Sequence, residues 1–289
     1  MHSIEVKELN KRFWIPENLA ECKRKQYLDM SKLVLMYQMA EISKEQFRVL
    51  ALYNLMNMVY SESELPNVQE EKWQNIYICS ELIDSFFHVD DAGVMHLVQD
   101  YIHNPVKVVS YKAMTFKGPK DGFQDITWKQ LVDGFGEVDA FLQDGKVERL
   151  VRLFAMFYLS PRSQYGKFDM DRRLKFFDQL DIRYVYSFYL LFLSFRKFLR
   201  EQSVIKIDGR EIDFTILFDG SANTGEEVSI DLPELGFRST SFQLAESGVF
   251  GPKEMLDQTN AWDVLTNIYD MVVRNKKKEA EMEAQKNKK

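Results

Sequence analysis

Apolar residues recur every three or four positions along most of this chain, the spacing that gives an α-helix one buried face. Ser43 followed by Gln46 is a capping-box pattern and marks the start of one helix. The stretch 171–202 is long for a single helix, and we expect a break near Leu180-Asp181. The predicted helices cover 19–40, 43–58, 70–88, 90–104, 146–160 and 171–202. Two more are predicted, one that begins at 128 and a last one that contains Trp262 and Val272.

Two shorter segments alternate apolar and polar residues, which is the pattern of a half-buried β-strand. In 3–16 the alternation around Ile4 and Phe13 is interrupted by a polar turn, so the segment is predicted to be a hairpin. In 204–218 it flanks Asp208-Gly209, a dipeptide typical of type I′ hairpin turns. The expected fold is α+β and predominantly α-helical, with short hairpins near 3–16 and 204–218.

The order of these elements predicts how the chain is divided. Residues 1–105 would form an N-terminal hairpin and helical domain, and 106–275 a helical domain with the second hairpin inserted. The segment 106–119 alternates loosely and is predicted to be a strand at the start of that second domain. The tail 276–289 is charged and almost free of apolar residues, so we expect it to be disordered.

Composition narrows the class of protein. Of 289 residues, 45% are hydrophobic and 13% aromatic, enough for a sizeable core. The net charge of −6 disfavours general binding to nucleic acid. With only Cys22 and Cys79, a disulfide scaffold and a four-cysteine zinc site are excluded, and we expect reduced thiols in a cytosolic setting. The most apolar run, Val185 to Phe195, is too short to cross a bilayer, which needs about 20 residues, so no membrane partner is expected.

Three residues are candidate metal ligands. On the predicted helix over 90–104, His96, Asp100 and His103 are spaced by four and three positions, so all three could share one helix face. Two imidazoles and a carboxylate suit zinc or ferrous iron. The other interpretation is a solvated polar face opposite Val94 and Leu97. A metal-dependent hydrolase using these residues remains an alternative function.

Two further segments have features of phosphate or nucleic-acid binding. "GSANTG" (220–225) has the glycine spacing of a phosphate-binding loop, but Glu226 stands where a lysine is needed, so the match fails. The basic end "RNKKKEAEMEAQKNKK" could bind nucleic acid, although interleaved glutamates dilute its charge. A nucleic-acid-binding accessory protein is therefore the second alternative. No cofactor is expected.

In the stretch "LGFRSTSFQLAESGVFGPKEM" (235–255), the apolar residues have neither the spacing of a helix nor the alternation of a strand. Its apolar residues are too many for a solvated linker, whereas Gly248, Gly251 and Pro252 are too many for one long helix. We expect Phe237 and Phe242 to anchor an irregular crossing of the chain. "FQLAES" would then form one or two helical turns that Gly248 ends, so that the stretch ties the last helix to the rest. If its apolar side chains are exposed, it becomes the best candidate for a partner surface.

Three segments together resemble known proteins. These segments are "VKELNKRFWIPENLAECKRKQYLDM", "RLKFFDQLDIRYVYSFYLLFLSFRKFL", and the L-A-E element at 244–246 followed by V-F-G and the helix "NAWDVLTNIYDMV". In the order and residue pattern of these three segments, the chain resembles tail-assembly-chaperone-type and minor structural proteins of tailed phages that infect Bacteroidota.

The resemblance implies a protein without enzymatic activity that acts through protein–protein contacts during tail assembly. Its partners would be other phage structural or tail proteins, with self-association as an option, and nucleic acid would not be one. The protein would work in the cytoplasm of the bacterial host or remain in the virion. The residues expected to contact a partner are Phe242, Leu244, Phe250, Trp262 and Tyr269.

Overall fold

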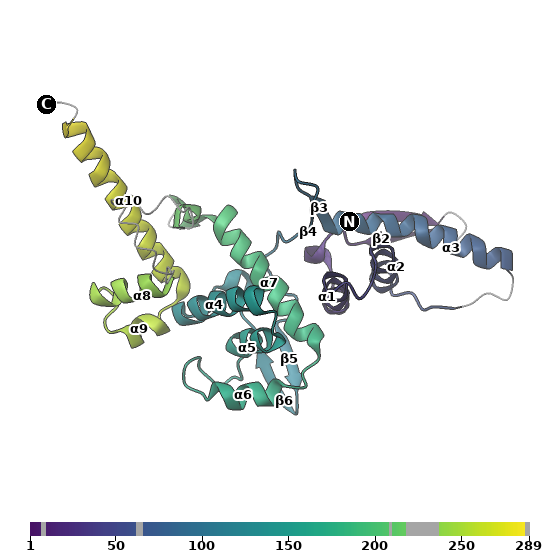
Figure 1. The fold of residues 1–289 in the computed structure, drawn as a ribbon, viewed down its shortest axis with the longest axis horizontal. Coiled ribbons are helices and arrows are strands. Elements are labelled where there is room, and N and C mark those ends of the chain that lie inside the picture. Colours follow the sequence, from purple (N-terminus) through teal and green to yellow (C-terminus); the bar gives the residue numbers. More distant parts are fainter. Residues whose placement is uncertain (7–9, 62–65, 208–209, 218–236, 287–289) are drawn as a thin grey trace. The chain divides into compact units, whose positions relative to one another are not determined.

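The computed structural model of the chain describes residues 1–289 except 7–9, 62–65, 208–209, 218–236 and 287–289 (Figure 1). The fold is mostly helical, at 61%, and the strands among the described residues, 12%, form four two-stranded antiparallel hairpins. The predicted helix-rich α+β class is therefore confirmed. The chain divides into two compact units, the first comprising 1–109 with 179–194 and the second 110–178 with 195–289.

The first unit opens with the predicted hairpin, β1 (His2–Val6) paired with β2 (Lys11–Ile15), in which Ile4 is opposite Phe13. A short 3-10 helix, η2 (Leu19–Glu21), leads into α1 (Arg24–Gln38) and α2 (Lys44–Leu55). The capping box at the start of α2 is confirmed: the Ser43 hydroxyl accepts from the Gln46 amide at 3.2 Å, and the Gln46 side chain accepts from the Ser43 amide at 2.8 Å.

The third helix of this unit differs from its predicted bounds. Helix α3 (Pro66–Ser80) continues as the 3-10 helix η3 (Glu81–Phe86), and the chain then becomes the strand β3 (Phe87–Val89). Helix α3 therefore begins four residues before the predicted start at Glu70, because Pro66 is tolerated in the first turn of a helix.

The helix predicted over 90–104 is wrong. Strand β3 pairs with β4 (Met95–Leu97), and the following residues to 107 are irregular. The Asp90 carboxylate accepts from the amides of Ala92 at 3.0 Å and Val94 at 2.8 Å, and Gly93 adopts a φ of +81°. An aspartate that bonds the backbone ahead of it and a glycine with positive φ stabilise a tight turn in place of a helix.

Helix α7 (Ile182–Glu201) supplies residues 182–194 to the first unit. The buried Tyr27 hydroxyl donates to the Ser187 carbonyl at 2.8 Å and lies 2.8 Å from the Tyr101 hydroxyl. Burial raises the pKa of Tyr101, so this phenol remains neutral and hydrogen-bonded. A buried polar pair of this kind holds α1 against the first part of α7.

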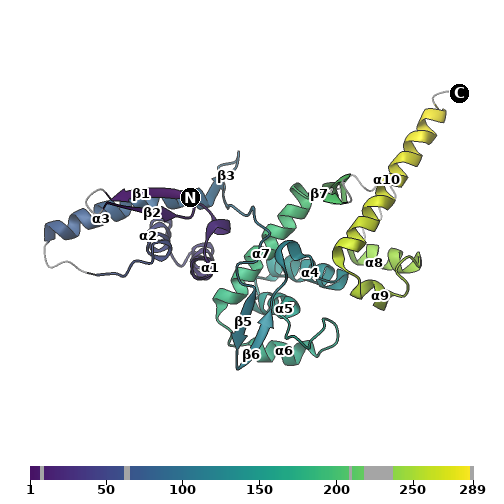
Figure 2. The ribbon, with the colours of Figure 1, turned by 180° about the vertical axis from the view of Figure 1, so that it is seen from behind.

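The strand predicted over 106–119 is instead a hairpin of β5 (Val108–Tyr111) and β6 (Met114–Lys117). Lys112 and Ala113 have φ of +45° and +60° and form its two-residue turn, a conformation that neither residue signals in the sequence. The hairpin lies beside α5 (Val147–Phe157) and α6 (Met170–Phe177) in both ribbon views (Figure 2). The rings of Phe116 and Phe177 pack there with centroids 4.9 Å apart.

Helix α4 (Trp128–Asp144) follows the short 3-10 helix η4 (Asp121–Phe123). Its predicted start is confirmed, since the Thr127 hydroxyl and the Gln130 side chain form a capping box. The break predicted near Leu180-Asp181 is also confirmed, because α6 ends at Phe177 and α7 begins at Ile182.

The second predicted hairpin is confirmed as β7 (Val204–Ile207) paired with β8 (Arg210–Asp213), followed by the 3-10 helix η5 (Phe214–Leu217). The Asp208-Gly209 turn and the "GSANTG" segment lie outside the described residues. Beyond them come α8 (Phe237–Glu246), α9 (Lys253–Gln258) and α10 (Ala261–Lys286).

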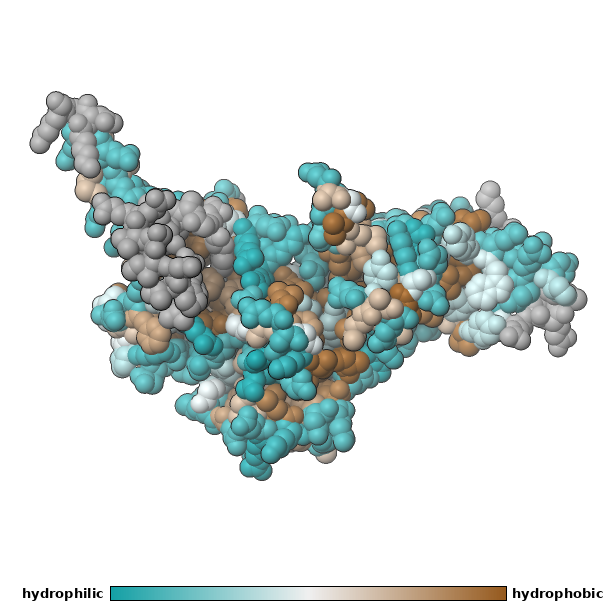
Figure 3. Space-filling model, in the orientation of Figure 1, coloured by the Kyte–Doolittle hydropathy of each residue, from teal (hydrophilic) through white to brown (hydrophobic). Residues whose placement is uncertain are grey.

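Helix α10 covers most of the tail that the sequence predicts to be disordered. It runs to Lys286, and residues 276–285 are exposed and largely hydrophilic (Figure 3). Alanine, glutamate, lysine and glutamine have high intrinsic helix propensity, so this segment can be helical without an apolar face.

Candidate protein-interaction site

Helix α8 is held on α4 by aromatic packing and one buried hydrogen bond. The Phe237 ring meets Trp128 edge-to-face at 5.6 Å and stacks on Phe135 at 5.6 Å. The buried Trp128 indole donates to the Ser241 hydroxyl at 2.9 Å. Ser241 in turn donates to the Phe237 carbonyl at 2.8 Å. These contacts fix which face of α8 points inward.

The inward face contains Phe237, Ser241 and Leu244, which are spaced by four and three residues as a helix face requires. Leu244 is only 2% exposed, and Leu256 of the neighbouring α9 is fully buried. The expectation that this stretch ties the C-terminal helices to the rest of the chain therefore agrees with its packing.

The outward side of α8 and α9 exposes three large apolar side chains. Phe242 is 52% exposed, Val249 in the connecting turn 59%, and Met255 of α9 61%. We call Phe242, Val249 and Met255 the α8–α9 apolar surface. The ammonium group of Lys253 lies 5.9 Å from the centre of the Phe242 ring and pairs with Asp257 at 2.9 Å. An apolar surface beside a polar rim is the composition of a protein contact site.

The turn between the two helices depends on glycine. Gly248 and Gly251 have φ of +72° and +75°, values that other residues adopt only with strain. The Met255 sulfur would lie 3.1 Å from a Cβ at Gly251, so the space there is also limited. The two glycines place Val249 outward between α8 and α9.

Of the three remaining predicted contact residues, Trp262 and Tyr269 have aromatic partners within the chain. Phe250 is half-buried. The Trp262 indole donates to the Gly122 carbonyl at 3.1 Å, and its ring packs against Phe214 at 5.7 Å. Tyr269 packs against the same phenylalanine at 5.8 Å. Trp262 and Tyr269 thus join α10 to η5, and of the five predicted residues Phe242 is the one with a mostly exposed side chain.

The candidate metal ligands do not share a helix face. His96 lies in β4 and its Nε2 atom is 2.8 Å from the Asp90 carboxylate, while its ring stacks on His88 at 5.4 Å. Asp100 and His103 lie in the irregular segment that follows. Within the part of the chain that the structure describes, no three histidine, cysteine, aspartate or glutamate side chains are grouped so as to hold a metal ion.

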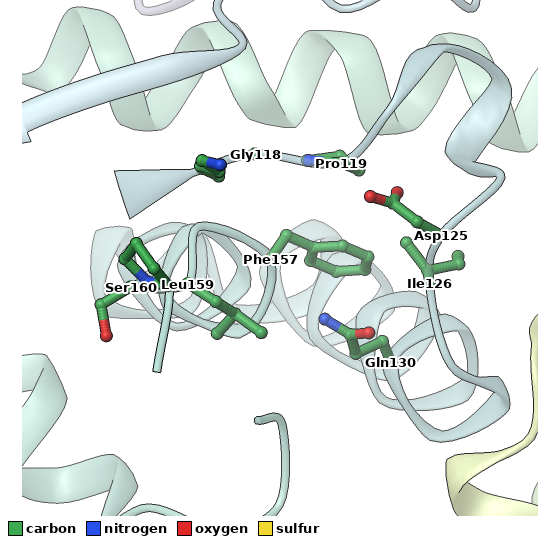
Figure 4. Close-up of a pocket in the computed structure, with 10 residues that line it drawn as sticks. Gly118, Pro119, Asp125, Ile126, Gln130, Phe157, Leu159 and Ser160 are labelled. Atoms are coloured by element: carbon green, nitrogen blue, oxygen red, sulfur yellow. The ribbon is translucent and has the colours of Figure 1, made fainter. Parts of the chain in front are cut away.

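A shallow pocket of about 180 Å³ lies between β6 and the ends of α4 and α5 (Figure 4). Its polar side chains bond the chain's own backbone. The Gln130 amide donates to the Met156 carbonyl at 2.8 Å, and the Asp125 carboxylate accepts from the Lys120 amide at 2.8 Å. These two groups stabilise the pocket walls, so neither is free to act on a ligand as the structure stands.

A second depression, of about 260 Å³, is lined by loop residues that the sequence reasoning did not single out. They are Pro161, Arg162, Ser163, Gln164, Lys167 and Phe168. A signal was present, because the segment 162–175 contains five basic and two acidic residues in a chain of net charge −6. A local charge count would have found it.

Comparison of the sequence with protein-family models, with curated proteins and with solved structures found no match. Among the described residues, no helix has the length and apolar character needed to cross a bilayer.

Proposed function

We propose that this protein has no enzymatic activity and assists the assembly of a tailed phage or prophage by binding other proteins. The observation that supports a binding role is the α8–α9 apolar surface, where three large apolar side chains face solvent on helices anchored to α4. The phage assignment comes from the sequence resemblance described above. The expected partners are tail or other structural proteins, and the expected location is the bacterial cytoplasm or the virion.

The size of the surface limits what it can do alone. Burying one large apolar side chain contributes about 1.5–3 kcal/mol. Forming a complex costs at least about 4 kcal/mol in lost translational and rotational freedom. Three residues would therefore leave only a small surplus, so a stable partner must also cover the polar rim, including Lys253 and Asp257. This is typical of interfaces in which a few apolar anchors are surrounded by polar contacts.

Co-expression provides the test. The chain would be produced with each tail-tube, tape-measure and other tail protein encoded near its own gene, and the co-purified partner identified by mass. We expect one of these proteins to co-purify with the wild-type chain and to be lost with the triple variant Phe242→Ser, Val249→Ser, Met255→Ser.

A matched control is available in the same unit. Met114, Leu142 and Val147 are exposed to a similar extent outside α8 and α9, and their triple serine variant should retain the partner. The proposed function would be wrong if no neighbouring tail protein co-purified, or if the gene lay in a metabolic operon.

A further inference from the structure

The segment from Pro161 to Phe176 has a charge opposite to that of the whole chain. It contributes Arg162, Lys167, Arg172, Arg173 and Lys175 against Asp169 and Asp171. The Asp169 carboxylate caps α6, accepting from the amides of Asp171 at 3.0 Å and Arg172 at 3.3 Å. One of the two negative charges is thus already engaged by backbone donors, and the positive charges dominate this surface.

The loop that presents Arg162 and Lys167 is anchored at its centre. The buried Tyr165 donates from its hydroxyl to the Asp133 carboxylate of α4 at 2.7 Å. The Gln258 side chain donates to the Tyr165 carbonyl at 3.2 Å. The hydroxyls of Ser160 and Ser163 are 2.6 Å apart at the start of the loop. A loop held in this way positions its charged side chains before any partner binds, which lowers the entropy cost of binding.

The cations at Arg162 and Lys167 are available to a partner. Arg162 and Lys167 are exposed, and among the described residues neither has a carboxylate within 4.0 Å. Arg173 is partly buried against the Phe168 ring at 4.6 Å and donates to the Ala155 carbonyl at 2.9 Å. Burial lowers the pKa of Arg173 to about 10, so it remains charged at neutral pH.

A fourth cation extends the surface toward β6. Lys117 and Leu159 form an isolated antiparallel bridge, with amide-to-carbonyl distances of 2.8 and 3.0 Å. Lys117 lines the shallow pocket beside β6, and Arg162 lines the second depression. Pro161 lines both, so the pocket and the depression are adjacent. Leu159, Pro161 and Phe168 add apolar lining between the charges. Hydrophilic surface covers the region of α6 in the space-filling view (Figure 3).

We infer that the surface formed by Lys117, Arg162, Lys167 and Phe168 binds an acidic, partly apolar segment of another protein. This surface shares no residue with the α8–α9 apolar surface. The inference therefore does not depend on the proposed function. The cations supply attraction for carboxylates, and the lining of Leu159, Pro161 and Phe168 suits apolar side chains placed between them.

Charge distribution favours a protein segment over nucleic acid. At physiological salt, charges interact over about 8 Å, so a short acidic segment interacts chiefly with this basic surface. A long polyanion would also meet the acidic remainder of a chain with net charge −6.

The test uses the full chain and three fluorescent probes: a short peptide of glutamates interspersed with leucines, its lysine counterpart, and an oligothymidylate of equal charge to the first. Binding is measured by fluorescence anisotropy at low and at physiological salt. We expect the glutamate peptide to bind most tightly, and Arg162→Glu with Lys167→Glu to weaken it about tenfold, because reversal replaces two attractions with repulsions.

The matched control is Lys277→Glu with Lys278→Glu in the exposed part of α10, which changes the net charge by the same amount. It should alter the affinity by less than about twofold. The circular dichroism of both variants should equal that of the wild type, since all four side chains are exposed. The inference would be overturned if both double variants weakened binding of the glutamate peptide equally, or if the oligothymidylate bound more tightly than that peptide. It would also be overturned if the glutamate peptide did not bind at low salt.

Discussion

Trp128 is fully buried, and the only acceptor within the chain for its indole N–H, among the described residues, is the hydroxyl of Ser241 at 2.9 Å. Ser241→Ala would leave a buried donor without a partner, which costs about 1–3 kcal/mol. We expect the free energy of unfolding, measured by urea denaturation, to fall by that amount.

Ser247→Ala is the control for this substitution. Ser247 is exposed, and its hydroxyl donates to the Leu244 carbonyl at 2.7 Å and accepts from the Val249 amide at 3.5 Å. Because water can replace both bonds at an exposed site, loss of the hydroxyl should cost less than about 0.5 kcal/mol. Equal stability of the two variants would show that α8 is not held on α4 by the Trp128 hydrogen bond.

The ion pair of Arg48 with Asp84 predicts a pH dependence. Arg48 donates from Nε to the Asp84 carboxylate at 2.7 Å, and this hydrogen bond lowers the pKa of Asp84. A carboxylate with a lowered folded-state pKa contributes stability above its unfolded pKa of about 4, and that contribution is lost as the pH falls through the folded-state value. The stability difference between wild type and Asp84→Asn should therefore be constant above about pH 5 and shrink in acid.

Denaturation curves at a series of pH values would measure this difference. Asp91→Asn is a suitable control, because Asp91 is exposed and forms no ion pair among the described residues. A difference between wild type and Asp84→Asn that stayed constant down to about pH 2 would contradict the role of the ion pair.

Which side chains are exposed was the hardest residue property to predict. Phe242 and Leu244 are two positions apart, so a helix directs them to different sides. The sequence placed both in one predicted contact set because the exact helix register of 235–255 was not evident from its broken apolar pattern. Once α8 is seen to begin at Phe237, the inward spacing through Ser241 to Leu244 follows directly.

At the scale of elements, predictions were most accurate where a helix has a local start signal. The Ser43 cap and the helix start at 128 were predicted correctly, because a capping side chain and the backbone amides that it bonds are within three residues of each other. The segment 90–104 was mispredicted because Val94, Leu97, Val98 and Tyr101 have helical spacing, whereas the backbone bonds of Asp90 and the positive φ of Gly93 determine a turn.

Gly93→Ala tests this account of the β3–β4 hairpin. A Cβ at Gly93 would meet no atom within 4 Å, so the cost arises from the φ of +81° alone and should be about 1 kcal/mol. We expect faster hydrogen exchange at the amide of Asp90, which donates to the Val94 carbonyl at 2.9 Å across the turn.

Gly118→Ala, at a glycine without positive φ, would control for the loss of a glycine as such. Unchanged exchange at Asp90 in Gly93→Ala would mean that the positive φ contributes nothing to the hairpin. The same reasoning applies to the β5–β6 turn, where Lys112 and Ala113 adopt positive φ without any sequence signal.

At the scale of the whole molecule, the helical class follows from periodicity, but the tertiary grouping does not. The first compact unit includes 179–194, a segment distant in sequence from the rest of that unit. The contacts of that segment, such as Tyr27 with Ser187, join residues 160 positions apart. No local pattern encodes a pairing over that distance, because it depends on how helices pack together.

The proposed function requires that a tail protein binds to the α8–α9 apolar surface. The most direct measurement is the affinity of the purified neighbouring tail protein for three forms of the chain: the wild type, the α8–α9 triple serine variant, and the Met114, Leu142 and Val147 control variant. We predict that the α8–α9 variant binds at least about tenfold more weakly and that the control binds as the wild type does. Equal affinity of all three forms would contradict the claim.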